Sequence, residues 1–96
     1  MIITTHSSGT RKILIVCDSD LIGKKFEEGN KQLDLTSEFY QGEEMSEEQL
    51  TPIIKTAYSI QFVGEESVAL AVKLGIVEEE KIIKIQNIPI VETLQA

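Results

Sequence analysis

Alternation of apolar and polar positions predicts strands in the first third of the chain. Residues 1–5 and 11–17, MIITT and RKILIVC, are rich in β-branched side chains and flank HSSGT, a polar loop with a glycine. This arrangement is typical of a β-hairpin. In KQLDLTSEFY, residues 31–40, Leu33 and Leu35 alternate with polar neighbours, which predicts a strand with one buried face. Three strands are therefore expected before residue 41.

Helical spacing of apolar residues begins in the middle of the chain. Ser46 is a good N-cap, and Gln49 stands three residues later to complete a capping box. Met45 and Leu50 form the matching hydrophobic staple. Apolar side chains then continue at the spacing of one helical face. This pattern predicts a first helix that begins at Ser46 and ends at or near Gly64.

The last third of the chain predicts a second helix and another strand. EESVALAVKL, residues 65–74, has helical spacing, with Gly75 at the C′ position and Ile76 placed to pack back onto the helix. KIIKI, residues 81–85, predicts a short strand. Pro89 is expected to end regular pairing or to lie at a sheet edge, because proline cannot donate a ladder hydrogen bond.

Together these segments predict one α+β domain. The order β-β-β-α-α-β favours a single small mixed or antiparallel sheet of about four strands packed against two helices. A chain of 96 residues has room for one hydrophobic core, so residues 1–96 are expected to form a single domain.

The composition is that of a soluble globular protein. Hydrophobic residues make up 42% of the chain, and the longest apolar runs, ILIVC and VALAV, are far shorter than the roughly 20 residues that cross a bilayer. The N-terminal segment lacks the pattern of a secretory signal, so a cytoplasmic location is expected. Cys17 is the only cysteine, and its place at the end of an apolar run predicts a buried small hydrophobe, not a reactive thiol.

The net charge of −7 is unevenly distributed along the chain. Residues 26–66 carry ten acidic and two basic side chains. Such a chain is poorly suited to binding a nucleic-acid backbone, which depends on Lys and Arg. The candidates for a local basic patch are Arg11, Lys12, Lys24 and Lys25. A protein partner is therefore favoured over RNA, and no membrane contact is expected.

The polar segment CDSDLIGKKFEEG, residues 17–29, follows a buried apolar run, as metal-binding and phosphate-binding loops often do. As a calcium loop that starts at Asp18, it has Ile22 at position 5 and Gly29 at position 12, where oxygen ligands are needed. As a P-loop it has Asp18 at the first glycine position and Lys25 in place of Ser or Thr. Both motifs fail, so a turn capped by its own side chains is favoured.

Two aromatic residues and one histidine are the other candidates. Phe39 and Tyr40 are neighbours at the end of a predicted strand, where successive side chains point to opposite faces. Either both are partly buried, or one enters the core and leaves the other for a partner. His6 is the sole histidine and lies in the predicted hairpin loop, which argues against a zinc site.

The order of three motifs resembles a known family. CDSDLIGKKFEEG, FYQGEEMS and VGEESVALAVKLGIV follow one another as in the small archaeal family catalogued as domain of unknown function 424. The resemblance covers residues 14–90 and implies a small α+β fold with no established activity. Many members have G-V-P-H near the end, where this chain has Asn87 and Ile90 around Pro89. The signature positions in this sequence are Asp18, Asp20, Gly23, Lys24, Phe39, Tyr40, Gly42, Glu43, Gly64, Glu65 and Pro89.

Two functions fit these observations. The first is a non-catalytic binding or accessory domain without cofactor or metal, linked through a protein partner to translation or RNA metabolism. Segments 18–24 and 39–43 are expected to form one contiguous surface for that partner. The candidate binding surface comprises Asp18, Asp20, Gly23, Lys24, Phe39, Tyr40, Gly42, Glu43, Gly64 and Glu65.

The alternative is a small enzyme dependent on Mg²⁺ or Mn²⁺. Asp18 and Asp20 would hold the ion together with Glu43 or Glu65, since these ions prefer carboxylate oxygens. The histidine missing after Pro89 weakens this alternative, so the binding domain is favoured.

Overall fold

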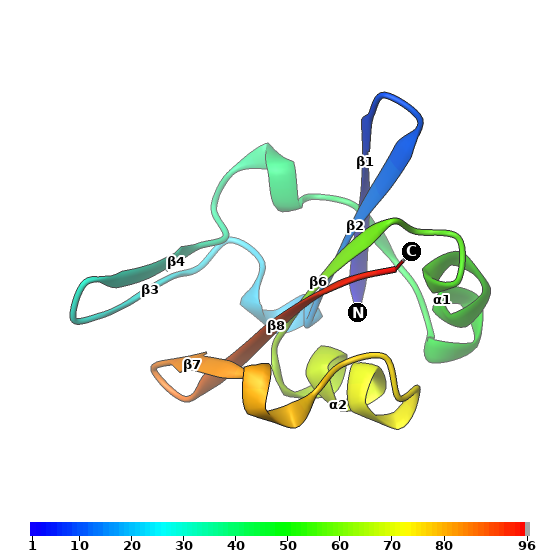
Figure 1. The fold of residues 1–96 in the computed structure, drawn as a ribbon. Helices are drawn as coiled ribbons and strands as arrows, with labels where there is room; N and C mark the ends of the chain where they lie inside the picture. Colours follow the sequence, from blue (N-terminus) through cyan, green and yellow to red (C-terminus); the bar gives the residue numbers. More distant parts are fainter. Residues whose placement is uncertain (96) are drawn as a thin grey trace.

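A six-stranded mixed sheet forms the centre of the computed structural model, which describes residues 1–95 (Figure 1). The strands are β1 (Ile2–Ser8), β2 (Arg11–Cys17), β5 (Glu43–Glu44), β6 (Ser59–Val63), β7 (Ile83–Ile85) and β8 (Ile88–Leu94). Their order in the sheet is β5-β1-β2-β6-β8-β7. β2 and β6 are parallel, and the other neighbouring pairs are antiparallel. The mixed α+β class is confirmed, but the expectation of about four strands is wrong.

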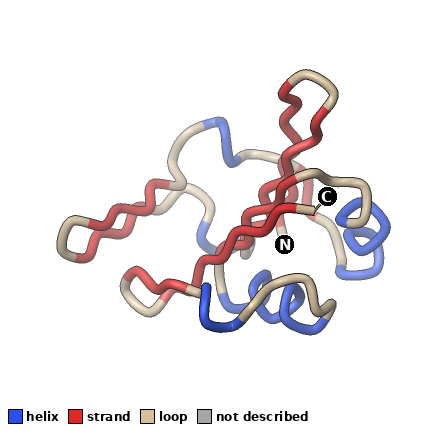
Figure 2. Tube along the Cα trace, viewed as in Figure 1, coloured by secondary structure: helices blue, strands red, loops and turns tan. Residues whose placement is uncertain are grey.

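A second, two-stranded sheet projects from the first as an arm (Figure 2). It consists of β3 (Lys25–Glu28) and β4 (Lys31–Asp34), paired antiparallel. The sequence predicts a turn where β3 lies. The reason is that Phe26, which faces Leu33 of β4, is the only apolar residue of β3. A strand with a single apolar position carries no detectable alternation.

The predicted strand over residues 31–40 is wrong in its second half. β4 ends at Asp34, and Glu38–Tyr40 forms a short 3₁₀ helix. Phe39 and Tyr40 are therefore neighbours on a helical turn, not on opposite faces of a strand. The Tyr40 N–H donates to the Ser37 carbonyl at 3.2 Å, which closes this turn.

Helix α1 (Glu47–Ile54) begins as predicted and ends early. Ser46 Oγ accepts from the Gln49 N–H at 3.3 Å, and Gln49 Oε1 accepts from the Ser46 N–H at 3.0 Å, which confirms the capping box. The helix ends at Ile54 because residues 59–63, SIQFV, form strand β6 at the centre of the sheet. A strand buried on both faces lacks polar alternation, so its apolar residues resemble a continuation of the helix.

Helix α2 (Glu65–Lys73) ends in the predicted Schellman motif. The Ile76 N–H donates to the Ala71 carbonyl at 3.3 Å, and the Gly75 N–H donates to the Val72 carbonyl at 3.0 Å. Gly75 has a φ of 70°, as the motif requires. A glycine and the apolar residue after it were therefore sufficient to predict this end.

Pro89 lies within β8, an interior strand, and pairs with Lys84 of β7. The expectation that Pro89 ends regular pairing or lies at a sheet edge is therefore wrong. The proline is tolerated because it lies just beyond the regular ladder between β6 and β8, which ends at the pair Val63 and Ile90, so position 89 needs no N–H.

Apolar side chains pack on both faces of the central sheet. One cluster joins Leu14 and Phe62 to apolar residues of α1 and α2, so both helices cover this face. The other cluster joins Cys17 and Val63 to Leu33 in the β3–β4 arm. Burial of Cys17 is confirmed at 1% exposure. Within residues 1–95, no helix has the length and apolar character needed to cross a membrane.

Candidate functional site

A pocket of about 260 Å³ lies at the carboxyl ends of the parallel strands β2 and β6. We call it the Asp18 pocket. It is lined by Asp18, Asp20, Leu21, Gly64, Glu65, Gln86, Asn87, Ile88 and Pro89. Three segments that are distant in the sequence meet here, and each contains residues that the motif analysis singles out. The carboxyl ends of parallel strands are also where α/β sheets commonly bind ligands.

Asp18 caps helix α2 from outside the helix. Its Oδ1 accepts from the Ser67 N–H and the Ser67 hydroxyl, each at 2.8 Å, and its Oδ2 accepts from the Glu66 N–H at 3.0 Å. The side chain is buried. A carboxylate in this place satisfies N–H groups that have no partner within the helix and lies at the positive end of the helix dipole. Both Asp18 oxygens are therefore engaged in holding α2.

Gly64 is required by the position of Asp18. Its φ of 105° is in the region that favours glycine, and a Cβ atom there would lie 2.3 Å from Asp18 Cγ. The Gly64 N–H donates to the Pro89 carbonyl at 2.9 Å, and the Asp18 N–H donates to the Val63 carbonyl at 2.9 Å. Three signature positions, Asp18, Gly64 and Pro89, thus form one structural unit.

The ionisable groups exposed at the pocket are both acidic, and they lie beside the apolar side chains of Leu21 and Ile88. Asp20 and Glu65 are exposed at its rim. Gln86 and Asn87 have φ values of 50° and 66° and form the turn between β7 and β8. The Gln86 Nε2 group donates to the Glu27 carbonyl at 2.6 Å, so this turn also holds the β3–β4 arm. The rim therefore offers two carboxylates and an amide-bearing turn held in place by the arm.

The candidates around Phe39 lie in a different place, against β1. The rings of Phe39 and His6 stack with centroids 3.9 Å apart and an interplanar angle of 7°. Phe39 is 48% exposed, while Tyr40 is partly buried against the core. His6 was expected in the hairpin loop but lies within β1, because the strand extends to Ser8. The result is an exposed aromatic pair beside a partly buried tyrosine.

Gly42 and Glu43 contribute to a pocket of about 300 Å³ that has no lining residue in common with the Asp18 pocket. A Cβ atom on Gly42 would lie 2.0 Å from the Ile3 carbonyl oxygen, so this glycine permits the approach of β1. Glu43 lies in β5 and pairs with Ile3. Asp18 and Asp20 thus line one pocket, and Gly42 and Glu43 line another. Near segment 39–43, the Ser19 hydroxyl donates to the carboxylate of Glu44, the residue that follows this segment.

Gly23 and Lys24 lead from the Asp18 pocket into the arm. Gly23 has a φ of 87°, and its N–H donates to the Leu35 carbonyl at 2.8 Å. The Leu35 N–H donates back to the Lys24 carbonyl at 2.9 Å. The backbone of this pair is therefore structural, whereas the Lys24 side chain is exposed.

The proposed metal ligands do not form a cluster. Among residues 1–95, no group of three or more His, Cys, Asp or Glu side chains is arranged to hold a metal ion. Asp20 and Glu65 share the pocket with Asp18, but Glu43 belongs to the other pocket. Since the Asp18 carboxylate already accepts three hydrogen bonds from α2, the geometry gives the Mg²⁺ or Mn²⁺ alternative no support.

Comparison with known proteins places the chain in a family. The family model described as protein of unknown function (DUF424) matches residues 5–94. The chain belongs to this family. The crystal structure of an uncharacterized conserved protein from Methanopyrus kandleri is similar to it, with a TM-score of 0.82 and 24% sequence identity, over 99% of this chain and 92% of that chain. This likeness shows a shared fold. No curated protein matches the sequence at a significant level.

Sequence reasoning missed part of the pocket of this DUF424 protein. Gln86, Asn87 and Ile88 line it and were not singled out as binding candidates. The pair Gln86-Asn87 stands between two apolar segments, and Asn tolerates positive φ. This pair therefore indicates a tight turn between two strands. What the sequence does not show is that this turn lies beside the end of β6.

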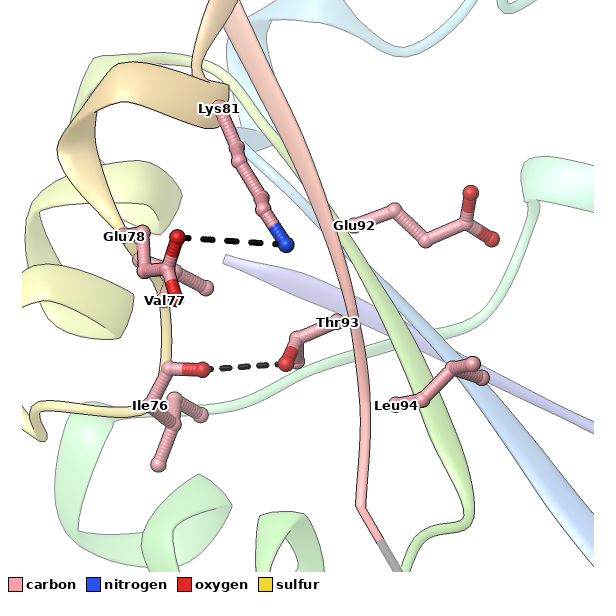
Figure 3. A pocket seen from close by; sticks show the side chains of 7 residues that line it. All are labelled: Ile76, Val77, Glu78, Lys81, Glu92, Thr93 and Leu94. Atoms are coloured by element: carbon pink, nitrogen blue, oxygen red, sulfur yellow. Dashed lines mark hydrogen bonds and ion pairs between the residues drawn. The ribbon is translucent and has the colours of Figure 1, made fainter.

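A larger pocket, about 540 Å³, lies at the other end of β8 in the DUF424 protein (Figure 3). The segment after α2 forms one wall, where the Thr93 hydroxyl donates to the Ile76 carbonyl at 2.9 Å. Lys81 Nζ lies 3.9 Å from the Glu78 carboxylate. Because these polar groups pair with each other, the pocket offers less to a ligand than its volume indicates.

Proposed function

We propose that this DUF424 protein is a non-catalytic binding domain that receives a basic side chain of a protein partner in the Asp18 pocket. One observation carries the proposal. Residues singled out by the motifs in three distant segments converge on one pocket, and its exposed ionisable groups, Asp20 and Glu65, are both acidic.

The chemistry of the pocket favours binding over catalysis. A carboxylate that acts as a base or nucleophile needs a free oxygen, whereas both oxygens of Asp18 accept hydrogen bonds from α2. The neighbouring Cys17 thiol is buried, and burial, with smaller contributions from Asp18 and Asp20, raises its pKa to about 12. Neither group is available for covalent or acid–base chemistry near neutral pH.

Size and charge favour the side chain of a protein. At about 260 Å³, the pocket is below the 300–1,000 Å³ typical of small-molecule sites, but it can take a guanidinium or ammonium group. Carboxylates at the rim would form charge-assisted hydrogen bonds with such a group. The net charge of −7 would also steer a basic partner toward the protein. Proteins that act in translation or RNA metabolism are rich in Lys and Arg, which makes them the partners we expect.

The test compares two double variants that remove the same charge. Asp20→Asn/Glu65→Gln neutralises the pocket rim, and Glu79→Gln/Glu80→Gln neutralises two exposed carboxylates elsewhere. Immobilised wild type and both variants are incubated with native cell extract, with and without RNase. We expect one protein to be retained by wild type and by the control, to be lost with the rim variant, and to be insensitive to RNase.

The retained protein is then purified and its affinity measured by calorimetry. We expect at least a tenfold weaker Kd for the rim variant, since charge-assisted hydrogen bonds contribute more than about 1.4 kcal/mol. Equal affinity for both variants would show that the partner binds elsewhere. Retention that RNase abolishes, or no retained protein at all, would contradict a direct protein partner.

A further inference from the structure

A second pocket, about 420 Å³, lies at the opposite end of the parallel strands β2 and β6. We call it the Arg11 pocket. It is lined by Thr10, Arg11, Lys12, Lys55, Thr56, Ala57, Tyr58 and Gln95. The lining holds three basic side chains and no acidic one, although the whole chain has a net charge of −7. This concentration of positive charge differs from the average surface of the protein.

Folding brings these cations together from separate segments. Arg11 and Lys12 follow the β1–β2 turn, and Lys55 follows α1. Figure 1 shows the loop after α1 beside the end of β8. The sequence grouped Arg11 and Lys12 with Lys24 and Lys25, but those two lysines follow the other end of β2, a strand about 20 Å long at roughly 3.3 Å per residue.

Two of the three cations of the pocket, Arg11 and Lys12, are held in place before any ligand arrives. The Arg11 guanidinium lies over the Tyr58 ring, 4.4 Å from its centroid, and Lys12 Nζ donates to the Thr56 hydroxyl at 3.2 Å. The Gln95 side chain donates to the Ile54 and Ala57 carbonyls at 2.8 and 2.9 Å, which holds the loop after α1. Binding to such a site loses less side-chain entropy than binding to mobile lysines.

The three positive charges are available to an external anion. The ion pairs within residues 1–95 involve the Met1 amino group, Lys25, Lys73 and Lys81, and so none of the three cations of the pocket. Hydroxyl groups of Thr10 and Tyr58 accompany the cations in the lining, whereas the Thr56 hydroxyl donates to the Ile53 carbonyl at 2.8 Å and serves to position Lys12. Arginine and lysine with nearby hydroxyl donors are the usual protein ligands of phosphate oxygens.

We infer that the Arg11 pocket binds a phosphate monoester. A terminal phosphate carries a charge of −1.5 to −2 at pH 7, which three cations can compensate. An extended nucleic-acid backbone fits less well, because ten acidic side chains in residues 26–66 would repel its further phosphates. The monoester can belong to a free nucleotide or to the 5′ end of an RNA. This inference is independent of the Asp18 pocket and its protein partner.

The test is an NMR titration of the full chain with AMP, adenosine, inorganic phosphate, an acidic peptide, and a trinucleotide with and without a 5′-phosphate. With AMP we expect shifts of the amide signals of residues 10–12, 55–58 and 95, and no comparable shifts with adenosine.

The same titration distinguishes the two natural sources of the phosphate. If the source is an RNA end, the phosphorylated trinucleotide binds more tightly than AMP; if it is a nucleotide, AMP binds at least as tightly. With at most three contacts, the slope of log K against log salt should not exceed about 2.

Two double variants that each remove two positive charges control for nonspecific attraction. Arg11→Gln/Lys55→Gln alters the pocket and should weaken AMP binding at least tenfold, while Lys31→Gln/Lys84→Gln alters exposed lysines elsewhere and should change it less than twofold. Circular dichroism checks that both fold. The inference is overturned if adenosine or the unphosphorylated trinucleotide binds as well as its phosphorylated counterpart. It is also overturned if both variants weaken AMP binding equally, or if the acidic peptide binds more tightly than every phosphate compound.

Discussion

Asp18 and Gly64 are in such close contact that no side chain larger than hydrogen fits between them. A Cβ atom on Gly64 would lie 2.4 Å from Asp18 Oδ2, the oxygen that accepts the Glu66 N–H. The carboxylate therefore approaches the start of α2 across the position where any other residue would place its side chain. A motif that suggests metal chemistry in the sequence is, in the structure, a link between the end of β2 and the start of α2.

Asp18→Ala should destabilise the protein by about 2–3 kcal/mol. The substitution removes three hydrogen bonds to a carboxylate and leaves the Glu66 and Ser67 donors without that partner. Urea denaturation followed by circular dichroism measures the change. Asp20→Ala is the control, because Asp20 is exposed and should alter stability by less than about 0.5 kcal/mol. Similar losses for both variants would show that Asp18 does not hold α2.

Gly64→Ala should cost more than about 2 kcal/mol, from a strained φ and from the clash with Asp18. Gly9→Ala is a matched control, since Gly9 has a φ of 64° and a Cβ atom there would have no other atom within 4 Å, so this variant should cost only about 1 kcal/mol. In the double variant Asp18→Ala/Gly64→Ala the clash is absent. Its loss of stability should therefore be smaller than the sum of the single losses. Strict additivity would contradict the contact.

Local signals in the sequence were sufficient to predict the start of α1 and the end of α2. In both places the pattern involves residues within six positions of one another, such as Ser46 with Gln49 and Ala71 with Ile76. Strand β6 was missed because its ladder partners are β2 and β8, which are far away in the chain. Spacing along one segment contains no information about pairing between residues that are 27 to 46 positions apart.

In the candidate site, too, the sequence indicated the residues but not the long-range contacts that give them their roles. Asp18, Asp20, Gly64 and Glu65 were selected from motifs, and the fold does bring them together. Their roles could not be predicted, because the capping of α2 by Asp18 joins residues 48 and 49 positions apart. The Arg11 pocket was only half predicted for the same reason, since Lys55 arrives from the loop after α1.

Acid should weaken the end of the β3–β4 arm through Asp34. Hydrogen bonds from the Thr36 hydroxyl at 2.6 Å and the Thr36 N–H at 3.0 Å lower the pKa of Asp34 below its usual 3.8. A carboxyl whose pKa is lowered on folding contributes stability above its unfolded pKa. That contribution is lost as the pH falls through the lowered value, so the effect lies below about pH 4.

Thr36→Val tests this link because it removes the hydroxyl and retains the backbone N–H. We expect the pKa of Asp34, followed by NMR of its carboxyl carbon, to rise toward 3.8 without reaching it. Thr5→Val, in an exposed position of β1, is the control and should leave the pKa of Asp34 unchanged. An unchanged pKa in Thr36→Val would show that the hydroxyl bond does not persist in solution.

Cys17 should resist thiol reagents as long as the protein is folded. Its thiol is 1% exposed, and burial raises its pKa to about 12, so about one thiol in ten thousand would be ionised at pH 8. We expect no reaction with a disulfide reagent in native buffer and one equivalent of reaction in concentrated guanidinium. Asp18→Ala alters the residue that follows Cys17 and breaks the link between the end of β2 and α2, so the variant should react faster than wild type, whereas Asp20→Ala should not. The Asp18 N–H donates to the Val63 carbonyl at 2.9 Å, and this hydrogen bond holds the end of β2 against β6. Rapid labelling of the native wild type would contradict the prediction, because it would show that this end of β2 opens frequently.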